Sequence, residues 1–288
     1  MTAEAYITDL DGTLLTSDQR LTDFTVQVIT EALDQGALIS YATARGYISA
    51  ARVVSQIPWK HPLILYNGAL IYDGINGKVI GGYWLDPVIS GEIISLGRKA
   101  GGLTPFYFSL DEDDNERVLY EPLTRSGEIR FYNSRPGDKR FREVNRLECP
   151  DGCRTLIISY IGLLEELQPI REAVQERFGD QLQIHFMQDI YIEDHYFLEF
   201  SHPRGNKSDG LKLWAQHMGV EPDKITVFGD HINDLGLFTA AGTGIAVQNA
   251  QPELKALADR VIDSNNEDGV AVYLEQALKL EKECVSGE

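Results

Sequence analysis

The stretch "AYITDLDGTLL" (residues 5–15) places two carboxylates, Asp9 and Asp11, directly after an apolar run and directly before Gly12 and Thr13. A short β-prone run followed by glycine predicts a strand that ends in a turn, so both aspartates should lie at the carboxyl end of that strand. In an open α/β sheet, ligands bind at this edge. Asp-Gly is also a common turn signal, so the stretch alone is equally compatible with an ordinary loop.

Strand and helix patterns alternate on both sides of a longer middle segment. The first run of elements is a strand near Ala5–Ile7, a helix at 23–35, a strand at 37–45 and a helix at 48–56. A third strand that runs into a loop follows at 63–73, and then a hairpin turn at "INGK" (75–78). The second run is a helix at 208–218, strands at 224–230, 243–247 and 260–263, helices at 234–241 and 252–258, and a closing helix. This β-α-β rhythm predicts a parallel sheet with right-handed crossovers.

The middle segment has a different rhythm. Its expected elements are a helix at 87–100, a solvated acidic loop at "SLDEDDNE" (109–116), an arginine-rich loop region, strands at 155–161, 182–187 and 196–201, and a helix at 163–178. We therefore expect an α/β protein with a Rossmann-like doubly wound parallel-sheet core at 1–83 and 202–288. An α+β domain at 84–201 should be inserted into this core.

Composition narrows the function classes. The net charge is -18, with 44 acidic and 26 basic residues, so a nucleic-acid partner is not expected. Nothing in the sequence resembles a membrane span or a signal peptide, and we expect a cytoplasmic protein without a membrane partner. A site for an anionic substrate would need local positive charge from a metal, a lysine or helix N-termini.

The three cysteines, Cys149, Cys153 and Cys284, do not form a disulfide framework. "CPDGC" (149–153) would need further ligands of similar spacing to bind zinc, and the sequence offers none. We expect a turn with two incidental thiols.

Three further positions could join the aspartates at the strand ends. Thr43 ends the strand "LISYAT", and its hydroxyl could hold a phosphate oxygen, although threonine is also simply a common strand residue. Lys207 precedes a helix, where the macrodipole disfavours it, so either a site role or an accident of the surface accounts for it. Asp230 follows the strand "ITVF" and Gly229, and it could cap the next helix or bind a ligand together with Asn233 and Asp234.

In this order, "DLDGTLL", Thr43, Lys207 and "GDHIND" (229–234) resemble the four motifs of the haloacid dehalogenase superfamily of phosphotransferases. The smaller features "YNGA" (66–69), "RGNKSDGL" (204–211), "VQNAQPELKALAD" (247–259) and "NNEDGVA" (265–271) resemble its Cof-type subfamily, in which a cap lies between the second and third motifs. Two positions depart from the pattern: Ala44 stands where many relatives have glycine, and His231 stands where a small or acidic residue is more frequent.

The resemblance implies a Mg²⁺-dependent phosphatase that hydrolyses small phosphate monoesters, with sugar (hexose) phosphates as the favoured class, through an aspartyl-phosphate intermediate. Asp9 would be the nucleophile and Asp11 the general acid and base. The implied Mg²⁺ ligands are Asp9, the backbone carbonyl of Asp11, Asp230 and, through water, Asp234. The implied phosphate-binding residues are Leu10, Thr43, Ala44, Lys207 and Asn233. Further candidates for substrate contact or support of the site are Arg45, Asn67 and His231.

Other functions use a similar arrangement. A phosphomutase or phosphotransferase would replace water by a sugar hydroxyl, and only product analysis separates it from a phosphatase. A receiver-like module that accepts phosphate as a signal has no use for a large insert or for Asp11 as a proton shuttle. Dehalogenases of the superfamily lack the carboxylate of Asp11. The physiological substrate, the cap residues that select it and the oligomeric state stay open.

Overall fold

The computed structural model describes residues 5–188 and 194–285, with side chains up to residue 278. Residues 1–4 of the acidic start, residues 189–193 of the expected insert and the side chain of Cys284 lie outside this described part. The chain forms two compact units: Met1–Gly82 with Asn206–Glu288, called the core unit below, and Tyr83–Gly205, called the insert unit. Each is described by itself.

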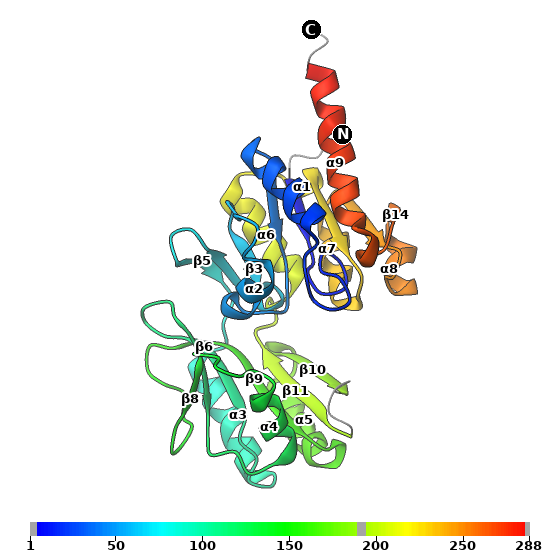
Figure 1. The fold of residues 1–288 in the computed structure, drawn as a ribbon. Helices are drawn as coiled ribbons and strands as arrows, with labels where there is room; N and C mark the ends of the chain where they lie inside the picture. The colour runs from blue at the N-terminus through cyan, green and yellow to red at the C-terminus, as the bar shows by residue number, and fades with distance from the viewer. Residues whose placement is uncertain (1–4, 189–193, 286–288) are drawn as a thin grey trace. The chain divides into compact units, whose positions relative to one another are not determined.

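A five-stranded parallel sheet forms the centre of the core unit, in the order β14-β13-β12-β1-β2. Figure 1 labels its edge strand β14. The strands are β1 (Ala5–Thr8), β2 (Leu38–Tyr41), β12 (Ile225–Gly229), β13 (Thr243–Val247) and β14 (Arg260–Ile262). Every residue of β1 is buried, because it pairs with β2 on one side and with β12 on the other. The first described strand of the chain is therefore an interior strand of this sheet, between its middle strand β12 and its edge strand β2.

Helices complete the α/β layers of the core unit. They are α1 (Asp23–Asp34), α2 (Tyr47–Val54), α6 (Lys207–Met218), α7 (Leu235–Ala240), α8 (Pro252–Leu257) and α9 (Gly269–Val285). Helix α1 packs beside α9, and α6 packs beside α7. The expected α/β class, with a parallel-sheet core and an additional α+β unit, is confirmed.

The prediction of a third parallel strand within residues 63–73 is wrong in part. Strand β3 (Leu63–Leu65) pairs antiparallel with β4 (Leu70–Asp73), which continues into β5 (Lys78–Gly82). A single parallel bridge, from Ala42 to Ile64, connects β3 with the strand segment of β2. The chain reverses at Tyr66, Asn67 and Gly68, which have φ values of 50°, 53° and 97°. A side chain on Gly68 would collide with the backbone of Asn206, so this reversal requires glycine.

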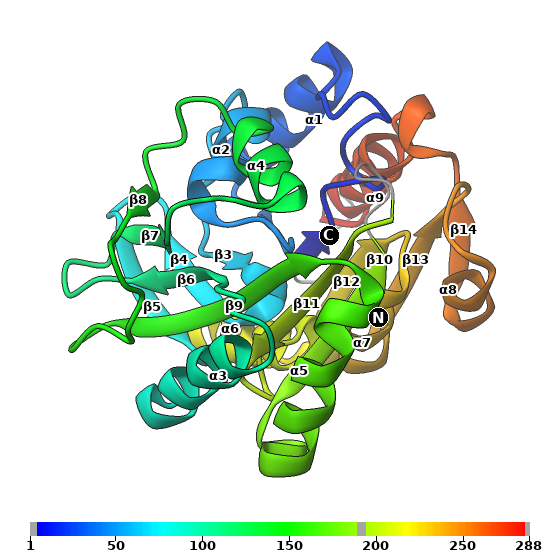
Figure 2. The ribbon, with the colours of Figure 1, turned by 90° about the horizontal axis from the view of Figure 1, so that it is seen from below.

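The insert unit is a six-stranded sheet with helices on both faces (Figure 2). Its strands, in the order β10-β11-β9-β6-β7-β8, are β10 (Gln183–Gln188), β11 (Tyr196–Ser201), β9 (Arg154–Gly162), β6 (Phe106–Leu110), β7 (Glu116–Tyr120) and β8 (Phe141–Glu143). Helices α3 (Pro87–Lys99) and α5 (Leu164–Phe178) contribute to one buried apolar cluster with Tyr107 and Tyr160. Helix α4 (Ser126–Asn133) contributes Phe131 to a second cluster, around Phe106.

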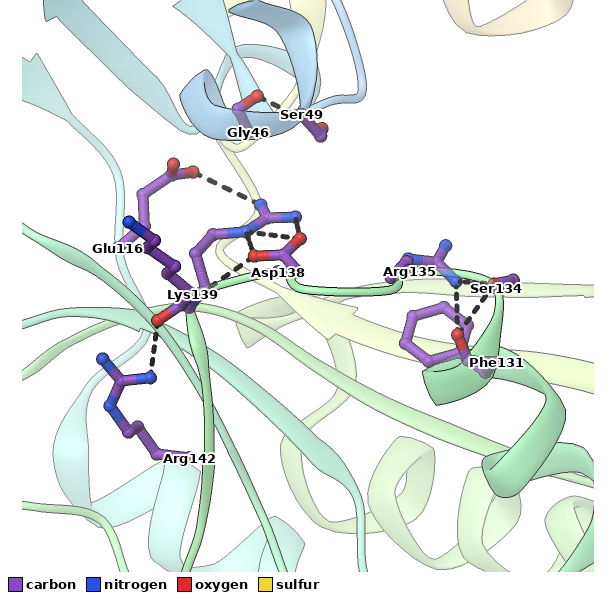
Figure 3. A network of polar contacts seen from close by, with 10 residues as sticks. Gly46, Ser49, Glu116, Phe131, Ser134, Arg135, Asp138, Lys139 and Arg142 are labelled. Atoms are coloured by element: carbon purple, nitrogen blue, oxygen red, sulfur yellow. Dashed lines mark hydrogen bonds and ion pairs between the residues drawn. The ribbon is translucent and has the colours of Figure 1, made fainter. Parts of the chain in front are cut away.

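The acidic run and the arginine-rich region were expected to be loops. Residues 111–115 of the acidic run do form a loop, whereas for the arginine-rich region the prediction is wrong. The ends of the acidic run belong to the hairpin β6–β7, and the arginine-rich region contains α4 and β8. Glu116 and Arg140 are both buried, and a salt bridge of 3.6 Å joins them (Figure 3). Arg140 also forms a salt bridge with Asp138 at 2.8 Å. Charged residues can form strands where a partner neutralises them, and the sequence does not show which residues will pair.

Two expectations from composition can be compared with the structure. Within residues 5–188 and 194–285, no helix combines the length and apolar character that crossing a membrane requires. Cys149 and Cys153 are free thiols, and the amide of Cys153 donates to the carbonyl of Pro150 at 3.3 Å. The "CPDGC" segment thus contains the expected turn.

Candidate active site

Strand pairing brings the first and fourth sequence motifs together. Thr8 in β1 lies opposite Phe228 in β12, and the amide of Asp9 donates to the carbonyl of Phe228 at 3.0 Å. Asp9 and Asp230 consequently leave the sheet at the same edge. Carboxylate oxygens of Asp9, Asp230 and Asp234 all lie within 4.8 Å of one another. We call these three residues the acidic cluster.

Lys207 lies in the acidic cluster. Its Nζ is 2.5 Å from Oδ1 of Asp9 and 2.6 Å from Oδ1 of Asp234, and its side chain has 0% exposed surface. A buried ammonium is stable only when it is paired, and two carboxylates supply that pairing here. Lys207 is the first residue of α6, after the helix cap Asn206, and these ion pairs oppose the unfavourable macrodipole. An accident of the surface does not explain this lysine.

Burial sets the electrostatics of the cluster. It raises the pKa of Asp9 to about 8, against the opposing charge of Lys207. It also raises the pKa of Asp230 to about 6, with a further contribution from the charge of Asp234. Burial disfavours the charged form of Lys207, but the carboxylates of Asp234 and Asp9 outweigh this effect and raise its pKa. Three carboxylates around one ammonium leave excess negative charge, which favours a further cation.

Asp234 is held entirely by protein groups. Its Oδ2 accepts hydrogen bonds from the amides of Asp230 and His231, both at 3.1 Å, while its Oδ1 accepts from Lys207. The carboxylate that caps this turn is therefore that of Asp234, and the alternative of capping by Asp230 is wrong. Asn233, which was expected to act together with Asp230 and Asp234, is exposed. Its Nδ2 donates to Oδ1 of Asn67 at 3.2 Å. The side chain of Asp230 remains accessible to a ligand.

The glycine and threonine of "DLDGT" contact Asp230. Gly12 has a φ of +80°, and a Cβ at this position would lie 2.4 Å from Oδ2 of Asp230, so only glycine fits. The hydroxyl of Thr13 donates to Oδ1 of Asp230 at 3.1 Å. Sequence reasoning did not assign a role to Thr13, although its place beside Gly12 in the first motif was a signal for one.

Thr43 lies just beyond β2, and hydrogen bonds hold both its backbone amide and its backbone carbonyl. Its amide donates to the carbonyl of Ile64 and its carbonyl accepts from the amide of Asn67, both at 2.9 Å. Its Oγ1 accepts from the amide of Arg45 at 3.1 Å. The short strand β3 and the reversal after it therefore fix Thr43, whereas the neighbouring Ala44 is exposed.

Asp11 is separate from the acidic cluster. Its carboxylate accepts two hydrogen bonds from Arg45, from Nε at 2.7 Å and from Nη2 at 2.5 Å. Arg45 Nη2 also donates to Oε1 of Gln19 at 2.9 Å. This two-pronged contact fixes the plane of the Asp11 carboxylate. The sequence identified Arg45 only as a possible contributor, and it gave no indication of Gln19.

The remaining expected residues have simpler surroundings. Leu10 is fully buried, and its carbonyl accepts from the amides of Leu14 and Leu15 at 3.1 and 2.8 Å. His231 is exposed, and its backbone amide belongs to the turn that Asp234 caps. Their side chains take no part in the acidic cluster.

The donor set fits a hard divalent cation. The acidic cluster offers only carboxylate oxygens, which Mg²⁺ prefers, and it contains neither the sulfur nor the nitrogen ligands that are typical of zinc. The burial of Asp9 and the excess of negative charge would both be compensated by such an ion.

The core unit thus has a parallel sheet with an acidic cluster and a buried lysine at its carboxyl edge, and an α+β unit interrupts its sequence. A family model described as haloacid dehalogenase-like hydrolase matches residues 6–274. The chain belongs to this family, as its four motifs indicate, and it is an enzyme.

Two relatives and one solved structure illustrate the similarity. HMP-PP phosphatase from Serratia proteamaculans (strain 568) is 24% identical over 283 residues, which cover 94% of each chain. The 5-amino-6-(5-phospho-D-ribitylamino)uracil phosphatase YitU from Bacillus subtilis (strain 168) is 25% identical over 291 residues, covering 94% of this chain and 96% of that protein. The crystal structure of TM0651 from Thermotoga maritima has a TM-score of 0.76 and 26% identity, and covers 96% of this chain and 97% of that one.

Proposed function

We propose that this protein is a Mg²⁺-dependent phosphatase that hydrolyses small phosphate monoesters, with sugar phosphates as the first class to test, through an aspartyl-phosphate intermediate. The observation that carries the proposal is the buried Lys207, which pairs with Asp9 and Asp234 beside Asp230. The family and the phosphatase names of its relatives support it. The two named relatives act on different compounds, so they do not select a substrate.

Asp9, the backbone carbonyl of Asp11 and Asp230 would hold the ion. Asp234 would act through water, because both of its oxygens already accept hydrogen bonds from protein groups. Bound Mg²⁺ would neutralise charge where an anionic substrate meets the carboxylate of Asp9.

The nucleophile is the carboxylate of Asp9. One of its oxygens attacks phosphorus in line, a bond from Asp9 to phosphorus forms, and the bond from phosphorus to the ester oxygen breaks. Asp11 gives a proton to the departing alcohol. Asp11 then takes a proton from the water that attacks the same phosphorus, which releases phosphate and restores the carboxylate of Asp9. Asp11 must carry the proton for the alcohol before the first step, and Arg45 orients Asp11 through two hydrogen bonds while it is ionised, one of which opens when Asp11 is protonated.

We propose that Lys207, which contacts Asp9, binds phosphoryl oxygens together with groups of the other motifs. The ammonium of Lys207 supplies the local positive charge that a protein of net charge -18 needs for an anionic substrate. The hydroxyl of Thr43, the amide of Asn233 and the backbone at Leu10 and Ala44 would complete the contacts. Asn67 then contributes by holding the amide of Asn233.

We assign the selection of the substrate to the insert unit, acting as a cap. The motifs of the core unit supply phosphoryl chemistry but few groups for the rest of a substrate, whereas the insert unit spans Tyr83–Gly205. Its two connections to the core unit include the residues just before Lys207, so a movement there would be linked to the site. We further propose that the enzyme acts in the cytoplasm, where the thiols of Cys149 and Cys153 stay reduced.

Phosphate release from a panel of phosphorylated metabolites, with and without EDTA, tests the proposal. We expect turnover that depends on Mg²⁺ and that disappears in Asp9→Asn. Asp263→Asn is a matched control, because Asp263 follows the edge strand β14 and is not part of the acidic cluster. Appreciable hydrolysis by Asp9→Asn would refute the nucleophile. Analysis of products in the presence of a sugar acceptor separates hydrolysis from transfer.

A further inference from the structure

Two asparagines from the last part of the chain bind the turn that follows β1. Nδ2 of Asn249 donates to the carbonyl of Gly12 at 2.7 Å, across 237 positions of sequence. Oδ1 of Asn249 accepts from the amide of Asn265 at 3.0 Å. Nδ2 of Asn265, a residue with 4% exposed surface, donates to the carbonyl of Leu15 at 2.9 Å. The two amides thus connect both ends of the turn Gly12–Leu15 with one C-terminal segment.

Asn266 and Asp268, which follow Asn265, bind residues between the turn Gly12–Leu15 and the first turn of α1. Asn266 exchanges two hydrogen bonds with Ser17, each at 2.9 Å. Oδ1 of Asp268 accepts from the hydroxyls of Thr22 and Thr25, at 2.6 and 2.8 Å. These contacts reach the start of α1, and they do not involve the turn Gly12–Leu15. Asn266 can therefore serve as a control for the two asparagines that bind this turn.

The turn Gly12–Leu15 contacts the acidic cluster. Gly12 packs against the carboxylate of Asp230, and Thr13 donates to it. The carbonyl of Asp230 accepts from the amide of Gln251, two residues after Asn249, at 2.8 Å. Asp230 is therefore held between the turn and the segment that binds the turn. A displacement of Gly12 would change its contact with the Asp230 carboxylate.

We propose that Asn249 and Asn265 are positioning residues for phosphoryl transfer. They hold the turn Gly12–Leu15 against Asp230 and thereby set the orientation of the Asp230 carboxylate and of the Asp11 backbone. Small displacements at such a site are costly, because the reaction depends on alignment within fractions of an ångström. The inference rests on the proposed function, since it concerns the same site.

Two variants of Asn249 separate positioning from mere attachment of the C-terminal segment. Asn249→Ala removes both hydrogen bonds of the side chain. Asn249→Asp keeps an acceptor for the amide of Asn265 but removes the donor to Gly12. If Asn249 only fastens the segment of Asn265, Asn249→Asp should behave like the wild type. If it positions Gly12, both variants should be impaired.

We expect both variants to lower kcat on p-nitrophenyl phosphate by about 10-fold to 100-fold, the usual range for residues that support a metal site, with KM changed by less than about threefold. The Mg²⁺ concentration for half-maximal activity should rise. Added negative charge in Asn249→Asp would by itself attract Mg²⁺ and lower this concentration, so a rise cannot come from charge. Asn266→Ala should leave kcat and the Mg²⁺ requirement within about twofold of the wild type.

Two measurements on the full chain do not depend on phosphatase activity. Calorimetric titration with Mg²⁺ alone should show weaker binding in both Asn249 variants, and hydrogen exchange at Gly12–Leu15 should be faster than in the wild type and in Asn266→Ala. Unchanged Mg²⁺ binding and exchange would overturn the positioning role. If these two shifts appear but no phosphate ester is hydrolysed by the wild type, the proposed function fails while the placement of the turn stands.

Asn265→Asp, at the buried asparagine, provides a second test. It keeps the size of the side chain and replaces the donor to Leu15 by an acceptor, so it should show the same loss of kcat and the same exchange pattern. Because it also faces a buried carbonyl, its thermal unfolding is measured alongside. A folded Asn265→Asp protein with the kinetics of the wild type would contradict the proposal.

Discussion

The ammonium of Lys207 lies 2.5 Å from Oδ1 of Asp9, although 198 positions separate the two residues in the sequence. Neither group is tolerated alone at this depth, since an isolated buried charge is far less stable than a paired one. The pair therefore links the second half of the core unit to its first strand. When its three carboxylates are ionised, the acidic cluster and Lys207 together carry two excess negative charges, which a divalent cation would balance.

Lys207→Met should strongly destabilise the metal-free protein. It leaves the carboxylates of Asp9 and Asp234 buried without their partner, and breaking such a pair costs about 3 to 5 kcal/mol. Mg²⁺ should recover part of this loss. Urea unfolding in EDTA and in Mg²⁺ measures both effects, with Lys212→Met, an exposed lysine of the same helix, as the control. An unfolding free energy equal to that of the wild type in EDTA would show that the ion pairs contribute nothing to stability.

Asp9→Asn and Asp11→Asn should impair catalysis in different ways. Asp9→Asn removes the nucleophile and should lower kcat by at least about a thousandfold on every substrate. Asp11→Asn should lower the first step by about 100-fold or more on a sugar phosphate, whose alkoxide needs a proton. The loss should be smaller on p-nitrophenyl phosphate, whose leaving group needs little protonation. Rapid-quench measurement of the first step decides, and equal losses on both substrates would count against Asp11 as the acid.

Arg45 should act through Asp11. Arg45→Ala and Arg45→Lys both lose the two-pronged contact, because lysine cannot reproduce the planar fork. We expect each to lower kcat on a sugar phosphate by about tenfold, and to have little further effect when Asp11 is already asparagine. A double-mutant cycle with Asp11→Asn gives this coupling directly. Fully additive losses would mean that Arg45 works independently, for example by touching the substrate.

Glu128, in α4, should make stability depend on pH. Burial raises its pKa from 4.5 to about 7, with the charge of Arg125 opposing the shift. Between these two values the folded protein binds more protons than the unfolded chain, so the contribution of Glu128 to the free energy of unfolding falls as pH rises from 4.5 toward 7. Glu128→Gln lacks this dependence.

The stability of Glu128→Gln relative to the wild type should consequently increase with pH. Urea unfolding of both proteins at several pH values between 4.5 and 8 gives the difference, in which the contributions of all other groups cancel. A difference that does not change with pH would contradict the raised pKa.

Replacing residues 84–201 by a short linker tests the proposed role of the insert unit. If the shortened core folds, as judged by its thermal transition, it should keep activity on p-nitrophenyl phosphate but lose discrimination. We expect the ratio of kcat/KM for the best sugar phosphate to that for p-nitrophenyl phosphate to fall by about tenfold or more. An unchanged ratio in a folded core would move specificity to Arg45, Asn67 and His231.

Local patterns of sequence were sufficient for most regular elements. The helix expected at 23–35 is observed at Asp23–Asp34, and the strand expected at 155–161 lies within Arg154–Gly162. The helix has apolar residues at helical spacing and Gly36 just beyond its end, and the strand is a nearly continuous apolar run that ends at Gly162, so both depend mainly on neighbours in the chain. The run 63–73 was predicted only in part, because the chain reverses at Tyr66, Asn67 and Gly68, where φ is positive. The Asn-Gly pair at 67–68 is the same turn signal that predicted the hairpin at 75–78, but the apolar residues on both sides of it favoured one strand.

Within the site, local sequence patterns were enough to identify the chemical groups and the strand ends that carry them. Asp9, Thr43 and Asp230 each follow a strand, and parallel strands end at one edge of their sheet, so their proximity could be inferred. Tertiary structure alone decided which partner each group has: Arg45 on Asp11, Thr13 on Asp230, and Asn249 on Gly12. These contacts depend on packing between distant segments, and the free energy of a hydrogen bond is set by the burial and geometry of both partners, which no single stretch of sequence contains.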